Sequence, residues 1–419
     1  MLDREKVGNA IATQRKQKGM TQRHLADMLN VSYQAVSRWE QGSSLPSVDM
    51  IYEIARTLDT TVDFLLNGLS NEKKTLTYMD TGLDVRKLYL TKRRLDELIT
   101  EDEMLLYAHY TDPVFFKPDI ARMEDPVCVL ATHVPGSKER FAMEHGYDRE
   151  ICLDLAANAT NNLARFGIKP TLFQAHVVCG NNDSGQLLMM GEAFKEFCEY
   201  NKMIFAGMEV GAQAVNYQPI EYKISATILG MTDKKSILTG NEIAPGDCII
   251  GLHSDGIYGT SYPFVKVMID KKPEMLYAKV DDKHTFMDAL IEPNAAYLDA
   301  ITELVANNLI HGIFIVTNSL FNSSVYFTMP EGLSACICIS EVPRLPLFRY
   351  LNGLNLMNEE TFLRNFSLGI GMLIVVAKDQ STRAVEIIEQ YHQCSIIGRI
   401  EKNTEYPDQK VRVEGSIKW

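Results

Sequence analysis

The stretch that most constrains the fold of this chain runs from Thr21 to Gly42, TQRHLADMLNVSYQAVSRWEQG. Apolar residues recur at helical spacing on both sides of Asn30-Val31, which predicts two short helices joined by a tight turn. Thr21 and Ser32 stand where each helix would begin, and their hydroxyls can accept hydrogen bonds from first-turn amides. Gly42 provides a stop for the second helix.

The outer face of the second predicted helix is polar. Val36 and Trp39 are three residues apart and turn toward the core, so polar side chains near the helix start face outward. In that position side chains reach base edges in a major groove. The candidate DNA-binding residues are Gln22, Arg23, Ser32, Tyr33, Gln34, Ser37, Arg38 and Ser43. The alternative interpretation is an ordinary helical hairpin with a solvated face.

With the helices expected around it, this stretch resembles the helix-turn-helix domains of the Cro and phage-repressor type (XRE-like) family. The resemblance covers residues 4–67 and includes Thr21-Gln22, the Val31-Ser32 turn and the exit Trp39–Gly42. It implies an all-α domain of five helices that binds double-stranded DNA.

The formal net charge of −12 looks unsuited to a protein that binds nucleic acid. Residues 1–67, however, hold eight basic and eight acidic residues, so the rest of the chain carries the whole excess. A local basic face is what phosphate contact requires. The basic residues within the first forty positions include Arg15, Lys16, Lys18, Arg23 and Arg38.

Length and composition predict a multidomain protein of the cytoplasm. A chain of 419 residues exceeds one typical domain, and its hydrophobic content of 46% supports sizeable cores. The eight cysteines include no C-x-x-C pair and no zinc spacing, so we expect reduced thiols and no metal site. The longest apolar run, near Gly369–Ala377, is about half a membrane span, so we expect no membrane partner.

A change of pattern divides the chain. Residues 1–67 form the helix-turn-helix domain, and GLSNEKKT at 68–75 is polar and predicts a linker. From Leu76 onward short apolar strands alternate with longer helices, which predicts an α+β domain with two subdomains, 76–230 and 231–419. Expected helices include Arg149–Phe166, Gln186–Tyr200, Tyr262–Ile269, Ala295–Asn307 and Ala384–Gln393, and expected strands include PVCVLAT, TLFQAHVVC, YKISATILG, CIIGL, GIFIVT, ACICI and GMLIVVA.

Five motifs in order make residues 77–400 similar to aminoimidazole ribonucleotide (AIR) synthetase and its ATP-binding superfamily. The motifs lie at Tyr78–Asp84, Ile151–Leu163, Ile243–Val265, Pro346–Leu351 and Asn365–Met372. The resemblance implies two α/β subdomains and a dimer formed through a sheet early in the domain.

Several positions depart from the family pattern. Its members use carboxylates to hold magnesium against ATP phosphates. The T-D-G-V-G-T-K loop is here Thr132–Lys138, with His133 in place of the acid, and the Asn-Asp pair is Asn161-Asn162. The H-S-N-G element is Tyr258–Ser261 and the T-G-G-G loop is Thr317–Leu320. These replacements predict loss of the parent chemistry, so we assign no catalytic residue and no metal.

Polar groups still occupy these positions. The G-G-E-T acid falls at Met208 or Glu209, depending on the register, and the retained Asp154 is expected to contact a ribose or to cap its helix. Such groups can hold a sugar or phosphate without metal, although solvated loops or satisfied buried amides are the alternative. The candidate ligand-binding residues are Lys138, Asp154, Asn161, Asn162, Glu209, Tyr258, Thr260, Thr317, Asn318 and Ser319.

Three functions follow from these observations. The leading hypothesis is a homodimeric transcriptional regulator that binds an inverted-repeat operator and senses a nucleotide or phosphoribosyl metabolite, with no certain cofactor. The second is an active ATP-dependent AIR synthetase-like enzyme that also binds DNA. The third is a dimerisation scaffold without a ligand.

Overall fold

The chain divides into two units, Met1–Thr77 and Tyr78–Trp419, and each is described by itself. The computed structural model describes residues 3–67, 78–108, 113–180, 183–219, 221–254, 256–317, 319–320, 325, 329–406, 408–417 and 419. The expected linker at 68–75 lies outside the described residues. No helix in the described part of the chain is long and apolar enough to span a membrane.

The first unit is all-α, as the sequence predicts. Thr21 and Ser32 cap their helices, since their side-chain oxygens accept hydrogen bonds from the amides of His24 and Ala35. Asn30 makes the turn between these helices with a positive φ of 52°. The described helices are α1 (Arg4–Gln17), α2 (Gln22–Met28), α3 (Tyr33–Glu40), α4 (Val48–Thr57) and α5 (Val62–Asn67).

A buried ion pair joins the ends of the helix-turn-helix segment. Arg15 donates to both carboxylate oxygens of Glu40, at 2.5 and 2.9 Å, and to the carbonyl of Met20. Gln22 donates to Glu40 as well, at 2.7 Å. Because this network links α1, α2 and α3 beneath a shared apolar core, it fixes the angle between the two helices of the motif.

The second unit, α+β as predicted, begins with a four-stranded sheet of order β3-β6-β4-β5. β4 and β5 are parallel, and the other neighbours are antiparallel. The strands are β3 (Pro126–His133), β4 (Pro170–Cys179), β5 (Ile204–Ala212) and β6 (Tyr222–Asp233), and a separate two-stranded sheet pairs β1 (Leu105–Tyr107) with β2 (Phe115–Phe116).

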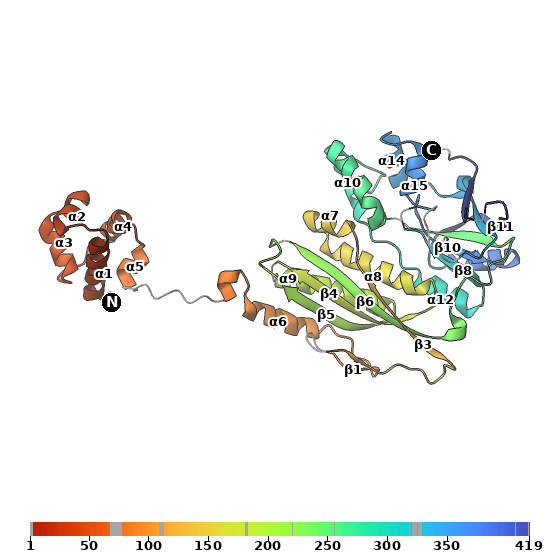
Figure 1. Cartoon of the computed structure of the whole chain (residues 1–419), viewed down its shortest axis with the longest axis horizontal. Helices are drawn as coiled ribbons and strands as arrows, with labels where there is room; N and C mark the ends of the chain where they lie inside the picture. The colour runs from red at the N-terminus through yellow and green to blue at the C-terminus, as the bar shows by residue number, and fades with distance from the viewer. Residues whose placement is uncertain are drawn as a thin grey trace. The chain divides into compact units, whose positions relative to one another are not determined.

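Two long helices cover one face of this sheet. α8 (Asp148–Ala164) packs on β3 and β6, and α9 (Ser184–Tyr200) packs on β5 (Figure 1). Alternate residues such as Ile224 and Ile228 are buried under the helices, while their neighbours on the opposite face are partly exposed. The remaining helices of this half are α6 (Val85–Asp96) and α7 (Lys138–His145).

The second half holds a six-stranded sheet of order β12-β9-β11-β7-β10-β8, antiparallel except for β12 beside β9. Strand β10, which lies between β7 and the edge strand β8, is buried on both faces, because Leu373 and Val375 enter one core and Ile374 and Val376 the other. The strands are β7 (Cys248–His253), β8 (Ile310–Ile315), β9 (Leu333–Cys338), β10 (Ile370–Val376), β11 (Cys394–Lys402) and β12 (Val411–Glu414).

Helices surround this sheet on both faces, with α12 and α16 forming one core with it. They are α10 (Tyr262–Lys271), α11 (Phe286–Ile291), α12 (Leu298–Ala306), α14 (Pro346–Gly353), α15 (Glu359–Asn365) and α16 (Ser381–Ile388). Short 3-10 turns lie at Tyr78–Thr81, Lys234–Ser236, Gly259–Ser261, Pro273–Tyr277, Ile339–Glu341 and Lys378–Gln380.

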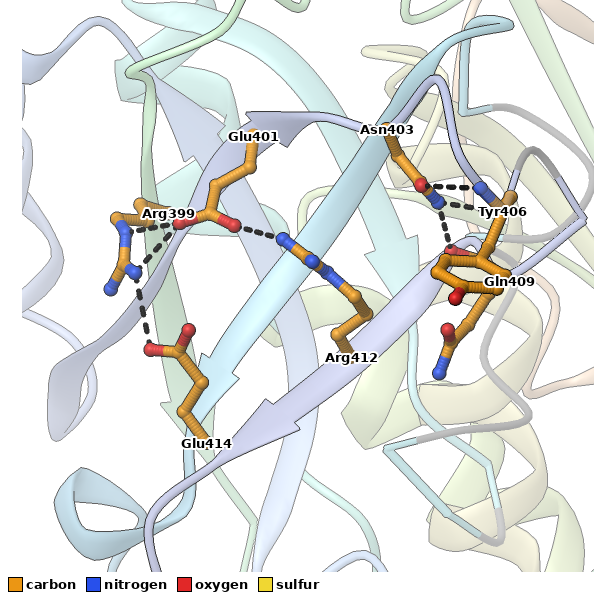
Figure 2. Close-up of polar contacts among 7 residues, drawn as sticks. All are labelled: Arg399, Glu401, Asn403, Tyr406, Gln409, Arg412 and Glu414. Atoms are coloured by element: carbon orange, nitrogen blue, oxygen red, sulfur yellow. Dashed lines mark hydrogen bonds and ion pairs between the residues drawn. The ribbon is translucent and has the colours of Figure 1, made fainter.

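An exposed charge cluster lies at the β12 edge of the six-stranded sheet (Figure 2). Arg399 contacts Glu401 at 2.7 Å and Glu414 at 3.1 Å, and Arg412 donates to the other oxygen of Glu401. The cluster therefore links β11 and β12, which both pair with β9.

Several element boundaries differ from the sequence prediction. The helix expected from Ala295 begins at Leu298, because the Ala295 carbonyl accepts a hydrogen bond from the Asn161 side chain. The helix expected through Gln393 ends at Ile388, and Gln393 instead accepts a backbone bond that leads into β11. β6 extends to Asp233, past the expected subdomain boundary between residues 230 and 231.

Candidate functional site

A cavity of about 590 Å³ lies in the second unit, where segments that follow strands of both sheets meet the C-terminal half of α8. Such a volume is sufficient for a small metabolite. The cavity is lined by His133, Val134, Pro135, Gly136, Asn158, Asn161, Asn162, Arg165, Tyr258, Gly259, Thr260, Ile315 and Thr317.

The wall formed by α8 is polar, but one of its amides is already used. The Asn161 side chain donates to the carbonyl of Ala295 at 2.8 Å and accepts from the amide of Tyr297 at 3.0 Å. Asn161 therefore connects α8 to the start of α12. Of the two alternatives that the sequence allowed, a ligand-binding residue or a buried amide with internal partners, Asn161 is the second. The other residues on this wall are Asn158, Asn162 and Arg165.

Lys138 and Asp154 form a fully buried ion pair beside the cavity. Their charged atoms lie 2.8 Å apart, and Lys138 also donates to the Glu292 carbonyl at 2.6 Å. The two Asp154 oxygens accept further hydrogen bonds from the Asn294 amide and the Asn158 side chain, each at 3.0 Å. Partners on all sides compensate for the loss of water around both charges.

Lys138 and Asp154 were predicted to bind a ligand, but the structure places both behind the cavity wall, where they pair with each other. Both are 0% exposed, and neither lines the cavity. The expectation that Asp154 caps its helix is wrong, because α8 begins at Asp148 and Asp154 lies in its interior. The pair holds the start of α7 against α8.

Two loops meet closely at the cavity mouth. A Cβ atom on Gly259 would lie 2.5 Å from the Pro135 carbonyl oxygen, so only glycine fits there without a shift. Tyr258 is 6% exposed, and its hydroxyl donates to the Gly371 carbonyl at 3.2 Å. Tyr258 thus presents its surface to the cavity while its polar atom is bound inside the core, and Thr260 is the exposed member of this loop.

The remaining predicted ligand residues are only partly brought together. Thr317 lines the cavity, but Ser319 is buried and donates to the Leu363 carbonyl at 2.8 Å. Asn318 lies outside the described residues. Glu209 is on β5, away from the lining, with its carboxylate 3.4 Å from the Lys92 amine.

The cavity lining carries positive and neutral groups. Within the described part of the chain, no aspartate or glutamate lines it. Burial lowers the pKa of His133, although the Asp154 charge opposes this shift, so His133 is neutral at pH 7. Burial also lowers the pKa of Arg165, whose guanidinium carbon lies 4.4 Å from the centre of the Phe166 ring. Arg165 remains charged because its ordinary value is far above neutrality.

Sequence analysis missed three polar lining residues, Asn158, Arg165 and His133, as ligand-binding candidates. One signal was present: positions 158, 162 and 165 follow the i, i+4, i+7 spacing of a single helix face. Asn162 was recognised from its motif, and the spacing from Asn162 would have pointed to the other two.

The first unit presents a second candidate site on α3. Tyr33, Gln34 and Arg38 are exposed along its outer face, whereas Val36 and Trp39 are buried. Arg23, Ser32 and Ser43 are exposed around it. The face therefore has the chemistry that base and phosphate contacts require.

Two other predicted DNA-binding side chains have partners within the unit. Gln22 donates to Glu40, so its amide positions the helix-turn-helix rather than standing free. Ser37 is partly buried and accepts from the Gln41 side chain at 3.3 Å.

Both units match known protein families. Residues 11–65 match the helix-turn-helix model, and residues 244–407 match the model described as AIR synthase related protein, C-terminal domain. Phosphoribosylformylglycinamidine cyclo-ligase of Oceanobacillus iheyensis is 26% identical over 327 residues, which cover 77% of this chain and 96% of that protein. The same-named protein of Streptococcus uberis is also 26% identical, over 75% of this chain and 93% of its own length.

Solved structures share the fold of the second unit. Thiamine-monophosphate kinase from Stenotrophomonas maltophilia has a TM-score of 0.56 at 14% identity and covers 79% of this chain and 95% of its own. The hydrogenase maturation protein HypE of E. coli has a TM-score of 0.53 at 14% identity, over 78% and 94%.

The fold and the matches together define a two-unit helix-turn-helix protein. Its first unit contains an XRE-type helix-turn-helix domain, and its second unit contains an AIR synthase-related C-terminal domain at residues 244–407. Both resemblances drawn from the sequence are confirmed.

Proposed function

We propose that this protein is a transcriptional regulator in which the helix-turn-helix unit binds an operator and the AIR synthase-related unit senses a small phosphorylated metabolite. The cavity is the observation that carries the proposal. Its volume of about 590 Å³ can hold a small metabolite, yet its described lining lacks the carboxylates that magnesium-dependent phosphoryl chemistry uses. A nucleotide or phosphoribosyl compound is the expected effector, by analogy with the substrate named in the cyclo-ligase relatives.

A magnesium–ATP site does not fit the lining residues that the structure describes. Mg²⁺ binds oxygen ligands and is usually held by one or two carboxylates together with substrate phosphates. Asp154, whose charge acts on the lining residue His133, is enclosed by Lys138 and two amide donors. Glu209, on β5, is paired with Lys92 of α6. We therefore propose that the cyclo-ligase activity named for the relatives is lost in this chain.

An enzymatic assay tests that loss directly. The full chain is incubated with ATP, magnesium and formylglycinamidine ribonucleotide, and AIR formation is measured against a cyclo-ligase relative. We expect no product above background. Steady turnover that disappears in a Glu209→Gln variant would instead support the alternative of an active enzyme that also binds DNA.

DNA binding is tested by selecting operators from random duplexes with the full chain. Arg38→Ala should weaken binding to the selected site by about 1–3 kcal/mol if Arg38 contacts a base. Arg56→Ala is the matched control, because Arg56 is an exposed arginine on α4 rather than on the outer face of α3. Equal affinity of the wild type and Arg38→Ala would contradict this assignment of the recognition helix.

The proposal includes a homodimer on an inverted repeat. A single helix-turn-helix buries little surface on DNA, and specificity usually comes from two copies on half-sites one helical turn apart. Light scattering should give twice the chain mass of 47.3 kDa, and footprinting should show two protected half-sites. A monomer that protects one half-site would contradict the dimeric arrangement.

Effector binding should appear as thermal stabilisation and as altered DNA affinity. A ligand at a hundred times its dissociation constant adds about 2.7 kcal/mol to stability, and allosteric coupling to DNA of about 1–3 kcal/mol is typical. If no purine nucleotide or ribotide shifts the unfolding transition, the ligand-free scaffold becomes the better description.

A further inference from the structure

Arg165 is a charged group on the cavity wall that has no ion-pair partner among the residues that the structure describes. It lies directly after α8, as the C-cap of that helix, and burial lowers its pKa with no opposing carboxylate among the described residues. Its Nε atom is buried and has no hydrogen-bond partner in the described part of the chain. A partly buried cation in this state is costly, and buried polar atoms are normally paired.

Other arginines of the unit show the contrast. Arg140, Arg149 and Arg364 are each paired with a glutamate, at 2.8, 2.5 and 3.1 Å. Arg140 and Arg364 are exposed and the Arg149 side chain is 40% exposed, so water screens these charges and they have less need of a partner than the half-buried Arg165. The Nε atoms of Arg344 and Arg412 are buried without a partner as well, but among the described residues only Arg165 combines such an atom with a place on the cavity wall.

Two internal contacts partly compensate for the charge of Arg165. The Phe166 ring, 4.4 Å away, attracts the guanidinium through its π face. The last carbonyls of α8 also favour a cation at this helix end. Neither contact supplies an acceptor for Nε, and neither explains why the arginine lines a cavity of about 590 Å³.

We infer that Arg165 is the anchor for a phosphate group of the effector, and that it binds this phosphate directly, with no divalent cation between them. A guanidinium matches a phosphate through two parallel hydrogen bonds, which a neutral wall cannot provide. Asn162 and Thr260 line the same cavity and add neutral donors for the remaining oxygens. This inference rests on the proposed sensing function and specifies the ligand class.

The absence of carboxylates from the described lining supports direct binding. In a magnesium site the protein's own acids hold the cation, and the cation then holds the phosphate. Here the described lining provides a cation, the Arg165 guanidinium, together with neutral amide and hydroxyl groups. A second cation next to Arg165 would be repelled, so the metal is replaced rather than supplemented.

The test compares phosphorylated and unphosphorylated probes by calorimetry on the full chain. AMP, adenosine, ribose 5-phosphate, ribose and inorganic phosphate are titrated with magnesium and again with EDTA. We expect AMP and ribose 5-phosphate to bind at least tenfold more tightly than their unphosphorylated partners, with the same affinity in EDTA. Inorganic phosphate separates recognition of the bare anion from recognition of the ester.

Variants then assign the effect to one residue. Arg165→Met keeps the length of the side chain and should remove the preference for phosphate, while Arg165→Lys should retain part of it. Arg364→Met is the matched control, because it removes an exposed arginine on α15 that is paired with Glu360. Circular dichroism checks that each variant is folded.

The results can contradict the phosphate inference without contradicting the proposed regulatory function. If AMP binds equally to the wild type and to Arg165→Met, or binds only with magnesium, the inference is wrong. Failure of every phosphate probe to bind the wild type also overturns it. Operator binding is measured separately, so a protein that binds DNA but no phosphate remains a regulator without this effector class.

Discussion

The Lys138–Asp154 pair and the Arg399–Glu401–Arg412–Glu414 cluster place the same chemistry in opposite surroundings. Lys138 and Asp154 are fully buried and joined to three further groups. The four-residue cluster is open to solvent, and its side chains are 25–50% exposed (Figure 2). A buried pair is costly to break because one charge stays behind in the core, whereas water takes over at the surface.

The surface cluster also shows why ligand geometry alone is a poor sign of a metal site. Cys336, Glu401 and Glu414 bring potential ligand atoms within 4.8 Å of one another. Burial and the two carboxylates raise the pKa of Cys336 to about 11, so the thiol is protonated at neutral pH. Arg399 and Arg412 already neutralise the acids. The cluster is a set of ion pairs across a sheet edge.

The largest expected effect comes from breaking the buried pair. Lys138→Met leaves Asp154 charged and without its partner. The free energy of unfolding of the second unit should therefore fall by about 3–5 kcal/mol. Urea denaturation followed by circular dichroism measures the change. The double variant Lys138→Met/Asp154→Asn removes the orphaned charge and should recover part of the loss. If Lys138→Met lowers the free energy of unfolding by less than about 1 kcal/mol, the buried pair contributes no more than the surface cluster, and the comparison fails.

A somewhat smaller effect is expected at the buried pair of the first unit. Glu40→Gln removes both carboxylate contacts of Arg15, and the two side chains are 6% and 8% exposed, less buried than Lys138. We expect a loss of about 2–4 kcal/mol, confined to the first unit. Trp39 lies in the core of that unit and reports its unfolding by fluorescence. Gln22→Ala, which removes one neutral donor to Glu40, should cost only about 1 kcal/mol.

The surface cluster should respond weakly. Glu401→Gln removes the carboxylate shared by Arg399 and Arg412, and we expect a loss of about 0.2–1 kcal/mol. Because the pairs are exposed, raising the salt concentration should reduce the difference between wild type and variant. Denaturation midpoints at low and high salt measure this. A loss as large as that of Lys138→Met would mean that the cluster behaves as a buried network.

The smallest effect is a pH dependence at His133, which lies near the buried pair. Burial lowers its pKa, so below about pH 6.5 the unfolded chain takes up a proton before the native one does. The contribution of neutral His133 to the free energy of unfolding is fully present above that pH. It declines as the pH falls toward the pKa of His133 in the folded protein. The slope between pH 7 and 5 should be smaller in His133→Asn. An NMR titration that places the His133 pKa above its ordinary value would contradict this.

Local patterns were sufficient to predict the first unit. The caps at Thr21 and Ser32 and the buried spacing of Val36 and Trp39 follow from residues within a few positions of each other. The sequence could not show that Gln22 turns inward to Glu40, because that contact joins α2 to the end of α3.

The cavity was predictable only in outline, because its residues come from segments far apart in the chain. The motifs brought Asn161, Asn162, Tyr258 and Thr317 to one place. Lys138 and Asp154 carry the right chemistry for a ligand, yet they satisfy each other across 16 residues. The helical spacing could have placed Arg165 beside Asn162, but no local pattern reveals that no acid among the described residues pairs with it.

The close contact of Gly259 with Pro135 limits which substitutions the cavity rim can accept, because the Pro135 loop continues into the buried core. Any side chain at position 259 would push on the loop that leads directly into Lys138, and so on the buried pair. Mutational drift at this point of the rim is therefore closed off. Change in ligand preference has room on the other walls, where Asn162 and Thr260 can vary without disturbing the buried pair, whereas Asn158 is held by its hydrogen bond to Asp154.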